Sequence, residues 1–399
     1  RGLPPCSDDA MAFKLAVAAL AACLAGAAAA EVDVAIPEGG GAVSFVSIGD
    51  WGGVALGDYH KTDELAVAKT FAQTAETLDA QFVVNTGDNF YYYGVWNTTD
   101  PQWDQDFEQV FTQKSMMVKW YSVIGNHGYG FNPEAQTQYT SPNNDRWVMD
   151  ARYYTRRVQI GTDQHISFVF MDSAPCNSAY RADDPSGWDP CGSSYPAPAN
   201  CQFHKNILSQ DCGKQLTWLK NTVAAIPDGD WKIAVTHMVA DEIDVVDMIS
   251  VLQQAKFDLY LNGHSHELSY YQIDSAGAYV TTGAGCMVKL DGTESGMVDQ
   301  NQVKADSHSI NFVFNQKVAG FTTHTFSSDL QTLTTNFVDY MGKTLYTFDI
   351  KKGQPTPPHP SDGSCAVYGC VYDRSHTCQC NSKCSDYNDC CSDYQKVCG

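Results

Sequence analysis

Five segments with the composition of buried β-strands each end in residues that can bind a metal ion. Three of them, SFVSIGDWGG, FVVNTGDNFYYYG and YSVIGNHGYG, run into a Gly-Asp or Gly-Asn step and supply Asp50, Asp88, Asn126 and His127. The other two, KIAVTH and FDLYLNGHSH, supply His237, His264 and His266. Because open α/β folds bind ligands at the carboxyl ends of their strands, we expect these side chains to converge at the edge of one sheet. This pattern restricts the chain to a layered α/β fold.

The rest of the pattern supports alternating strands and helices. Apolar, β-branched runs predict strands over 43–48, 82–84, 120–124, 166–171, 231–235 and 259–261. Helical spacing of apolar residues predicts helices over 65–78, 216–225 and 243–252. From 279 to about 350 the chain is rich in strands with Thr at alternate positions, which is typical of half-exposed antiparallel strands. We expect a second sheet to pack on the first.

The donor set at the strand ends indicates a pair of ions. Two aspartates, one asparagine and three histidines suit borderline or hard transition-metal ions, and the absence of thiolates argues against structural zinc or iron–sulfur sites. Each signal alone is weak, since a Gly-Asp step is usually a turn and a single strand-end histidine is usually structural. Six such side chains exceed what one catalytic ion needs, and two ions roughly 3.5–4 Å apart commonly attack phosphate esters. The hypothesis is therefore phosphate-ester hydrolysis.

The motifs GDWGG, GDNFYYYG, GNHG, the strand-end His237 and GHSHELSY resemble the five ordered motifs of the metallophosphoesterase superfamily. Within it, a tyrosine three residues after Asp88, here Tyr91, is typical of purple acid phosphatases, and the chain is similar to their small, tartrate-resistant type. The resemblance continues through DPQWDQDFEQVF, QLTWLK, YVTTGAG and GKTLYTFDI, over roughly residues 43–351. It implies an α/β fold in which a layered β-sandwich is flanked by helices, in the order αββα.

The resemblance also implies a metal centre and its ligands. Fe(III) would be held by Asp50, Tyr91 and His266, and a divalent ion, which is iron, zinc or manganese in the family, by Asn126, His237 and His264. Asp88 would bridge the two ions. Hydroxide formed at the metals would attack a phosphate monoester, and His127 would protonate the leaving group.

The charge of the chain limits its partners. The formal net charge is −21, which disfavours nucleic acid. The metal centre implied by the resemblance would carry a net charge of about +1, so a small phosphate ester could still bind.

Three positions depart from the family pattern. Gly128 stands where an acidic residue usually follows the motif histidine, and Ala234 stands where a valine is usual. A histidine that contacts substrate is missing downstream of His237, and Asp241 or Glu242 is expected to occupy its space. The seven expected metal ligands are all present, so we expect an active enzyme with altered rate or specificity.

Two alternatives to a phosphomonoesterase stay open. The same fold could act on phosphodiesters or pyrophosphate bonds, which the missing histidine favours. In a different class, the large domain could be a scaffold in a non-catalytic extracellular binding protein that acts through a cysteine-rich module at the carboxyl end.

The amino-terminal residues have the composition of an export signal. Met11 and Lys14 precede a stretch rich in Ala and Leu that ends at Ala30, which is typical of a secretory signal peptide. About sixteen mostly Ala residues are too few to span roughly 30 Å of hydrocarbon. We expect residues 1–10 to precede the translated start, residues 1–30 to form the signal-peptide region, and the mature chain to begin near Glu31. No membrane span is expected.

Cysteine usage agrees with export, because 15 cysteines suit an oxidising compartment. Four of them, Cys176, Cys191, Cys201 and Cys212, are expected to form two disulfides in one of three connectivities. Cys286 has no obvious partner. We expect a secreted or extracellular protein, or one in a cell-wall or lysosome-like compartment, and glycosylation at the sequon Asn97-Thr98-Thr99.

The carboxyl end is expected to be a separate module. A proline-rich linker, 351–364, follows a catalytic domain over 31–350, and eight cysteines lie within 365–399. So short a segment needs disulfides, and zinc binding is disfavoured because His376 is the only histidine among these cysteines. The spacing, with CQC and CC pairs, resembles the somatomedin B domain, which implies contact with an extracellular protein partner. The sequence leaves the disulfide connectivity open.

Overall fold

The computed structural model describes residues 32–37, 40–183, 188–192, 198–290 and 308–354. It also describes residues 365, 370, 379–387, 390–391 and 394–398 near the carboxyl end. The expected signal-peptide region and residues 355–364 of the expected linker lie outside these ranges. No helix within them is both long enough and apolar enough to cross a membrane.

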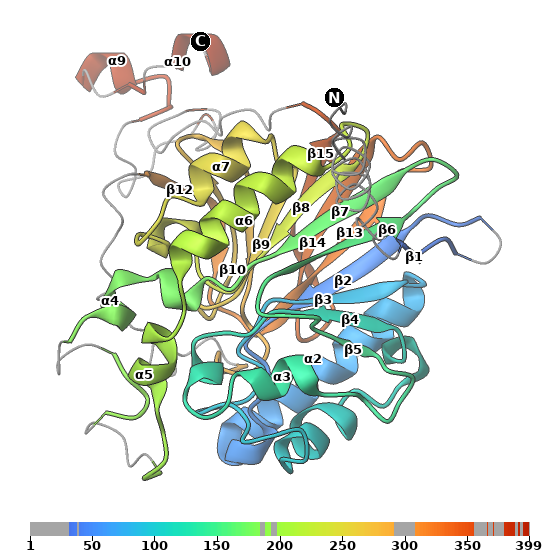
Figure 1. Cartoon of the computed structure of the whole chain (residues 1–399). Coiled ribbons are helices and arrows are strands. Elements are labelled where there is room, and N and C mark those ends of the chain that lie inside the picture. Colours follow the sequence, from blue (N-terminus) through green and yellow to red (C-terminus); the bar gives the residue numbers. More distant parts are fainter. Residues whose placement is uncertain are drawn as a thin grey trace, which may run out of the picture.

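Two mixed sheets form the body of the molecule (Figure 1). The larger contains, in spatial order, β1 (Val32–Val34), β6 (Tyr154–Gln159), β7 (His165–Phe170), β8 (Trp231–Val235), β9 (Leu259–Asn262), β11 (Ala276–Thr282), β10 (Leu268–Ile273) and β12 (Ile310–Gln316). The smaller contains β15 (Thr344–Lys351), β14 (Thr332–Asp339), β13 (Gly320–Phe326), β2 (Ser44–Ile48), β3 (Phe82–Asn85), β4 (Lys119–Ser122) and β5 (Trp147–Val148).

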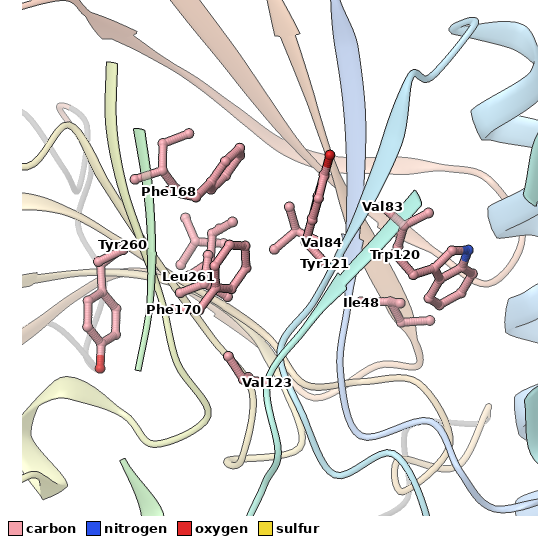
Figure 2. Close-up of a cluster of buried hydrophobic side chains, with 14 of the residues drawn as sticks. Ile48, Val83, Val84, Trp120, Tyr121, Val123, Phe168, Phe170, Tyr260 and Leu261 are labelled. Atoms are coloured by element: carbon pink, nitrogen blue, oxygen red, sulfur yellow. The ribbon is translucent and has the colours of Figure 1, made fainter. Parts of the chain in front are cut away.

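The inner faces of the two sheets pack on each other through large apolar side chains. Phe168 on β7 lies 5.7 Å from Phe82 on β3 and 6.2 Å from Phe45 on β2, both in edge-to-face geometry. Figure 2 shows this layer, in which Phe170 and Leu261 of one sheet face Val84 and Tyr121 of the other. Burial of each such side chain contributes about 1.5–3 kcal/mol, so this layer holds the sandwich together.

Helices cover the outer faces of both sheets. The long helix α2 (Asp58–Thr77) packs on β2 and β13, and α6 (Cys212–Ala225) and α7 (Ile249–Gln254) lie over the larger sheet (Figure 1). Shorter helices are α3 (Glu134–Gln138), α4 (Ser178–Arg181), α5 (Phe203–Leu208), α9 (Cys384–Tyr387) and α10 (Tyr394–Val397). The order helix, sheet, sheet, helix confirms the expected αββα sandwich.

The prediction that all five motif strands end at the edge of one sheet is wrong. Strands β2, β3 and β4 belong to the smaller sheet, whereas β8 and β9 belong to the larger one. Within each group the strands are parallel neighbours, so each group delivers its motif residues to one edge. The two edges meet because the sheets are stacked, and the sequence pattern alone does not distinguish stacked sheets from one continuous sheet.

Two other expectations need correction. The helix expected over 243–252 begins only at Ile249, because the N–H groups of Asp244 and Val245 donate to the carbonyl of Cys176 instead of continuing a helix. The strand-rich region after residue 279 does not form a sheet of its own. It divides between the sheets, with β11 and β12 in the larger and β13 to β15 in the smaller.

Disulfides hold the long excursion between β7 and α6. The pairs are Cys176–Cys212 and Cys191–Cys201, which confirms two bridges and selects one of the three connectivities. Cys286 is buried and forms no disulfide with any described cysteine. In the carboxyl-terminal module the described bridges are Cys365–Cys380, Cys370–Cys398 and Cys384–Cys390, and Cys378 lies outside the described residues.

A buried ion pair stabilises the β3–β5 half of the smaller sheet. The Arg146 guanidinium is fully buried, pairs with Glu108 at 2.8 Å and donates to the carbonyl of Phe111 at 2.6 Å. We expect Glu108→Gln to lower the free energy of unfolding by about 3–5 kcal/mol, because it leaves a buried guanidinium without its carboxylate. Urea denaturation with the disulfides intact measures this loss. The double variant Glu108→Gln/Arg146→Met should recover most of the loss, and a single-variant loss below about 1 kcal/mol would contradict the assignment.

Candidate metal centre

Four expected ligands lie on backbone turned into the left-handed region. The φ angles are 57° at Asp50, 50° at Asp88, 76° at His264 and 47° at His266. Non-glycine residues rarely adopt this conformation, and such residues cluster at functional sites. Each lies just after a strand, so the sharp turn directs its side chain across the end of the sheets.

Glycines in the motifs let the turns approach these side chains closely. A Cβ atom on Gly125 would lie 2.0 Å from Oδ1 of Asp88, and one on Gly263 would lie 2.4 Å from Oδ2 of Asp50. Any side chain at either position would displace the carboxylate. The glycines before Asn126 and His264 are therefore required by space at this centre.

One cluster of donors contains Asp50, Tyr91 and His266, all buried. The Tyr91 hydroxyl donates to Oδ1 of Asp50 at 3.1 Å, and Nε2 of His266 lies 3.3 Å from that hydroxyl and 3.4 Å from the same carboxylate oxygen. Burial, followed by the charges of Asp50 and Asp88, raises the pKa of Tyr91 well above its usual value. A tyrosinate here therefore requires a highly charged cation beside it.

A second cluster lies next to the first. Oδ1 of Asn126 is 2.8 Å from Nε2 of His237 and 3.0 Å from Nδ1 of His264. Nδ1 of His237 lies 2.8 Å from the carbonyl oxygen of Thr86, which can only accept a hydrogen bond. That bond keeps a proton on Nδ1 and turns Nε2 toward the cluster, as metal-binding histidines require.

Asp88 joins the two clusters. Its carboxylate lies within 4.8 Å of the ligand atoms of both Asp50 and His266, and within the same distance of those of His237 and His264. Oδ1 accepts the backbone N–H of His127 at 2.9 Å, and buried Oδ2 lies 3.1 Å from Nε2 of His237. Burial opposes ionisation of Asp88, but His237 and His127 outweigh it and lower its pKa below the usual value. The structure thus brings the seven expected ligands together, and their oxygen and nitrogen donors fit two cations that share one carboxylate.

His127 is held at the rim of this group by the main chain. Its Nδ1 donates to the carbonyl of Tyr92 at 2.7 Å, and its Nε2 lies 3.9 Å from Oδ2 of Asp88. The carbonyl of Tyr92 therefore orients the ring, in the absence of the acidic residue that Gly128 replaces. A Cβ atom on Gly128 would lie 2.5 Å from Cγ2 of Ile124, so a side chain there would need local rearrangement.

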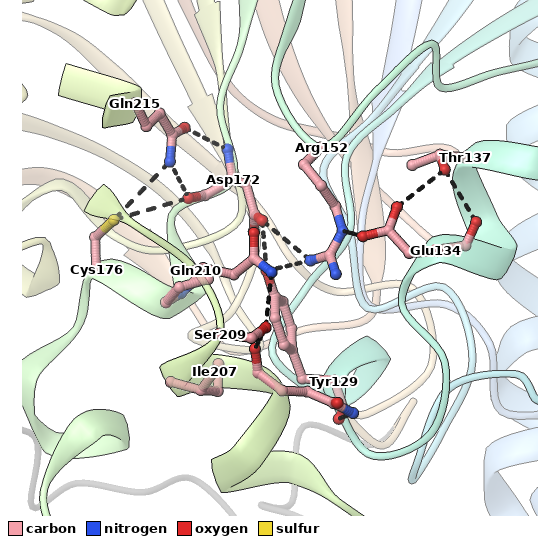
Figure 3. Close-up of polar contacts among 12 residues, drawn as sticks. Tyr129, Glu134, Thr137, Arg152, Asp172, Cys176, Ile207, Ser209, Gln210 and Gln215 are labelled. Carbon is pink, nitrogen blue, oxygen red and sulfur yellow. Dashed lines mark hydrogen bonds and ion pairs between the residues drawn. The ribbon is translucent and has the colours of Figure 1, made fainter. Parts of the chain in front are cut away.

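A buried polar network fixes the loop that carries His127, and sequence reasoning missed it. Tyr129 donates to Asp172, which follows β7, and Arg152 contacts Asp172 at 3.3 Å and Glu134 at 2.9 Å (Figure 3). Gln215 on α6 bonds both the N–H and the carbonyl of Asp172. The signal was present in the sequence, since Asp172 is another acidic residue directly after a predicted strand.

The disulfide-held excursion adds aromatic residues beside the centre, which were also missed. The ring of Trp188 lies 5.0 Å from that of His127, and the ring of Tyr180 lies 6.5 Å from that of His264. Asn206 on α5 donates to the carbonyls of Tyr129 and Phe131 at 2.8 Å, which ties the excursion to the His127 loop. The excursion has no catalytic motif, so only the three-dimensional structure relates it to the site.

Of the two acidic residues Asp241 and Glu242, Glu242 has a side chain that reaches the metal centre. Oε2 of Glu242 lies 3.3 Å from Nε2 of His264, on the side away from Asn126. Glu242 is thus the acidic residue that contacts an expected ligand.

Comparisons with known families match both parts of the chain. The family described as calcineurin-like phosphoesterase matches residues 43–268, and the somatomedin B domain family matches residues 363–399. These regions contain all the expected ligands and the eight clustered cysteines.

Individual relatives agree with the family match. Tartrate-resistant acid phosphatase type 5 of Sus scrofa is 32% identical over 250 residues, which cover 60% of this chain and 69% of that protein. Its namesake in Mus musculus is 28% identical over 329 residues, which cover 79% and 91%. Among solved structures, GAP50, the anchor in the inner membrane complex of Plasmodium, is similar with a TM-score of 0.54 and 22% identity, over 78% of this chain and 90% of that one. That last similarity concerns the fold alone.

Proposed function

Since the chain belongs to the calcineurin-like phosphoesterase family and its relatives are named acid phosphatases, we propose that it is an acid phosphatase that hydrolyses small phosphate monoesters. The observation that carries this proposal is the position of Asp88 between two clusters of buried donors. Two ions sharing a carboxylate can hold a phosphoryl group and the attacking oxygen together.

The finer proposal is an Fe(III) ion paired with a divalent ion of iron, zinc or manganese. The contact between Tyr91 and Asp50 supports it, because a buried phenol beside a carboxylate becomes a useful ligand only if a strong Lewis acid removes its proton. Asp50, Tyr91 and His266 would hold the ferric ion, Asn126, His237 and His264 the divalent ion, and Asp88 both. When bound, the ions would activate water for attack and neutralise charge on the phosphoryl group.

Residues of the chain would handle the proton of the leaving group. With Nδ1 of His127 bonded to the Tyr92 carbonyl, its Nε2 is the atom available to protonate the departing alkoxide. The polar network around Tyr129 and Asp172 keeps this loop in place, and the ring of Trp188 packs edge-on against that of His127. An acidic pH optimum would follow if His127 must be protonated.

We further propose that the protein acts outside the cell or in a lysosome-like compartment. The disulfides of the excursion and of the somatomedin B module support an oxidising environment. Asn97 is exposed, as a glycosylated residue would need to be. The somatomedin B module would bind an extracellular protein partner.

The test uses Tyr91→Phe in the secreted full chain. We expect the wild-type protein to bind about two metal ions, to absorb broadly in the visible and to hydrolyse p-nitrophenyl phosphate at acid pH. The variant should lose the visible band because it removes the proposed tyrosinate. Tyr93→Phe is the matched control, since Tyr93 belongs to the same motif but packs on Phe131, and it should keep the colour.

Three other results would each change a different part of the proposal: the ferric ion, the substrate class or the enzyme as a whole. A colourless wild-type enzyme with two ions and phosphatase activity would refute the ferric ion but keep the phosphatase. Faster turnover of bis(p-nitrophenyl) phosphate than of p-nitrophenyl phosphate would favour the diesterase alternative. A folded protein without metal or activity would overturn the enzyme and leave the somatomedin B module as the main function.

A further inference from the structure

The carboxylate of Glu242 contacts the outer side of one proposed metal ligand. His264 has two ring nitrogens, and they face in different directions: Nδ1 lies 3.0 Å from Oδ1 of Asn126, and Nε2 lies 3.3 Å from Oε2 of Glu242. The side chains of His264 and Glu242 are 9% and 14% exposed, so bulk water screens this contact only in part.

The geometry assigns different roles to the two nitrogens. Oδ1 of Asn126, Nε2 of His237 and Oδ2 of Asp88 form a chain of contacts of 2.8 and 3.1 Å, and Nδ1 of His264 points into the same group. An ion held by these atoms would use Nδ1 of His264. Nε2 would then carry the ring proton, and a carboxylate is the strongest acceptor for it.

We propose that Glu242 is a positioning residue for His264, which accepts the Nε2 proton and so strengthens binding of the divalent ion. This inference rests on the proposed dinuclear site. Such a carboxylate fixes the tautomer of a metal-binding imidazole, orients the ring and increases its basicity, and loss of such a partner typically costs 10–100-fold in metal affinity. The added negative charge also has a second effect, because it weakens binding of phosphate at the same ion.

The backbone around Glu242 is anchored on several sides, as a positioning residue requires. Glu242 ends a short 3-10 helix, Ala240–Glu242, five residues after His237. The N–H of Ala240 donates to the hydroxyl of Tyr271 at 3.2 Å. On the other side of Glu242, the N–H groups of residues 244 and 245 donate to the carbonyl of Cys176, at the root of the disulfide-held excursion. The carboxylate is therefore presented from a fixed segment.

The test compares Glu242→Gln with Asp241→Asn, which removes the same charge one residue away. Metal-depleted full chain is titrated with Zn²⁺ by calorimetry. We expect Glu242→Gln to raise the Kd of the weaker site about 10–100-fold and Asp241→Asn to change it less than about threefold. At saturating Zn²⁺, inorganic phosphate should inhibit Glu242→Gln at several-fold lower concentration than the wild type, because one negative charge is gone. Glu242→Asp should partly restore metal affinity.

Weaker Zn²⁺ binding together with stronger inhibition by phosphate in Glu242→Gln would support the inference, because a merely structural ion pair would not produce both. If Zn²⁺ affinity is unchanged while the melting temperature of the metal-depleted variant falls, Glu242 forms only a structural ion pair and the inference is overturned. Equal losses in both variants would overturn it as well, since general charge would then explain them. If the wild-type chain itself binds no ion, the proposed dinuclear site is refuted. If the wild type binds ions and Glu242→Gln binds them equally well, only the role of Glu242 is refuted.

Discussion

Asp88→Asn is expected to yield a folded protein that has lost its paired metal ions and nearly all phosphatase activity. Asp88 is the one carboxylate whose oxygens lie within 4.8 Å of ligand atoms in both described clusters. An amide keeps the shape but removes the charge that holds two cations close together. A loss of about 4–5 kcal/mol of transition-state stabilisation corresponds to a fall of 10³-fold or more in kcat/KM. Metal analysis and steady-state kinetics with p-nitrophenyl phosphate measure the two losses.

Asp172→Asn is the matched control for this variant. Asp172 is also a buried aspartate after a strand, but it pairs with Arg152 and Tyr129 and is not among the expected ligands. We expect it to lower stability and to slow turnover through the His127 loop, while retaining about two metal ions per chain. If Asp88→Asn also kept two tightly bound ions, the bridging role of Asp88 would have to be abandoned.

His127→Asn is expected to lower kcat by about 10²–10⁴-fold while metal content stays unchanged. The reason is that Nε2 of His127 is the proposed proton donor, and its ring is already held by the Tyr92 carbonyl at 2.7 Å. The loss should depend on the leaving group. An alkyl phosphate such as β-glycerophosphate needs the proton, whereas p-nitrophenolate leaves without one.

The comparison of these two substrates is the internal control for His127. We expect the variant to lose at least tenfold more activity toward β-glycerophosphate than toward p-nitrophenyl phosphate. Equal losses would show that His127 binds the phosphoryl group and donates no proton. Near-ultraviolet circular dichroism checks that the loop around His127 keeps its packing.

The αββα fold and the convergence of the expected ligands were predictable because both depend on local signals. Strand-end motifs such as GNHG and GHSH combine a buried strand with a glycine that leaves room for a facing carboxylate, as the structure shows at Gly125 and Gly263. The alternation of β-strands with helices likewise predicted that helices and sheets form separate layers. Strand ends matched to within a residue or two, as at β8, because the apolar run and the buried run coincide.

What the sequence could not provide are contacts between segments far apart in the chain. The allocation of β2 to β4 and of β8 and β9 to different sheets depends on which faces stack, and strand composition carries no such information. Trp188 approaches His127 because the disulfide-held excursion folds back over the centre, not because of any local pattern. Asp172 is an intermediate case, since its place after a strand was visible but its role depends on Arg152, twenty residues earlier in the chain.

The division of the expected ligands between two sheets has a consequence for the whole molecule. Asp50, Asp88 and Asn126 follow strands of the smaller sheet, whereas His237 and His264 follow strands of the larger. Ions bound among them would link the two layers at one end of the sandwich. Binding to the native state alone adds about 4 kcal/mol when free metal exceeds its Kd a thousandfold. The supply of metal would then set the stability of the sandwich as well as the rate of catalysis, and a chelator would weaken the link between the two layers at that end.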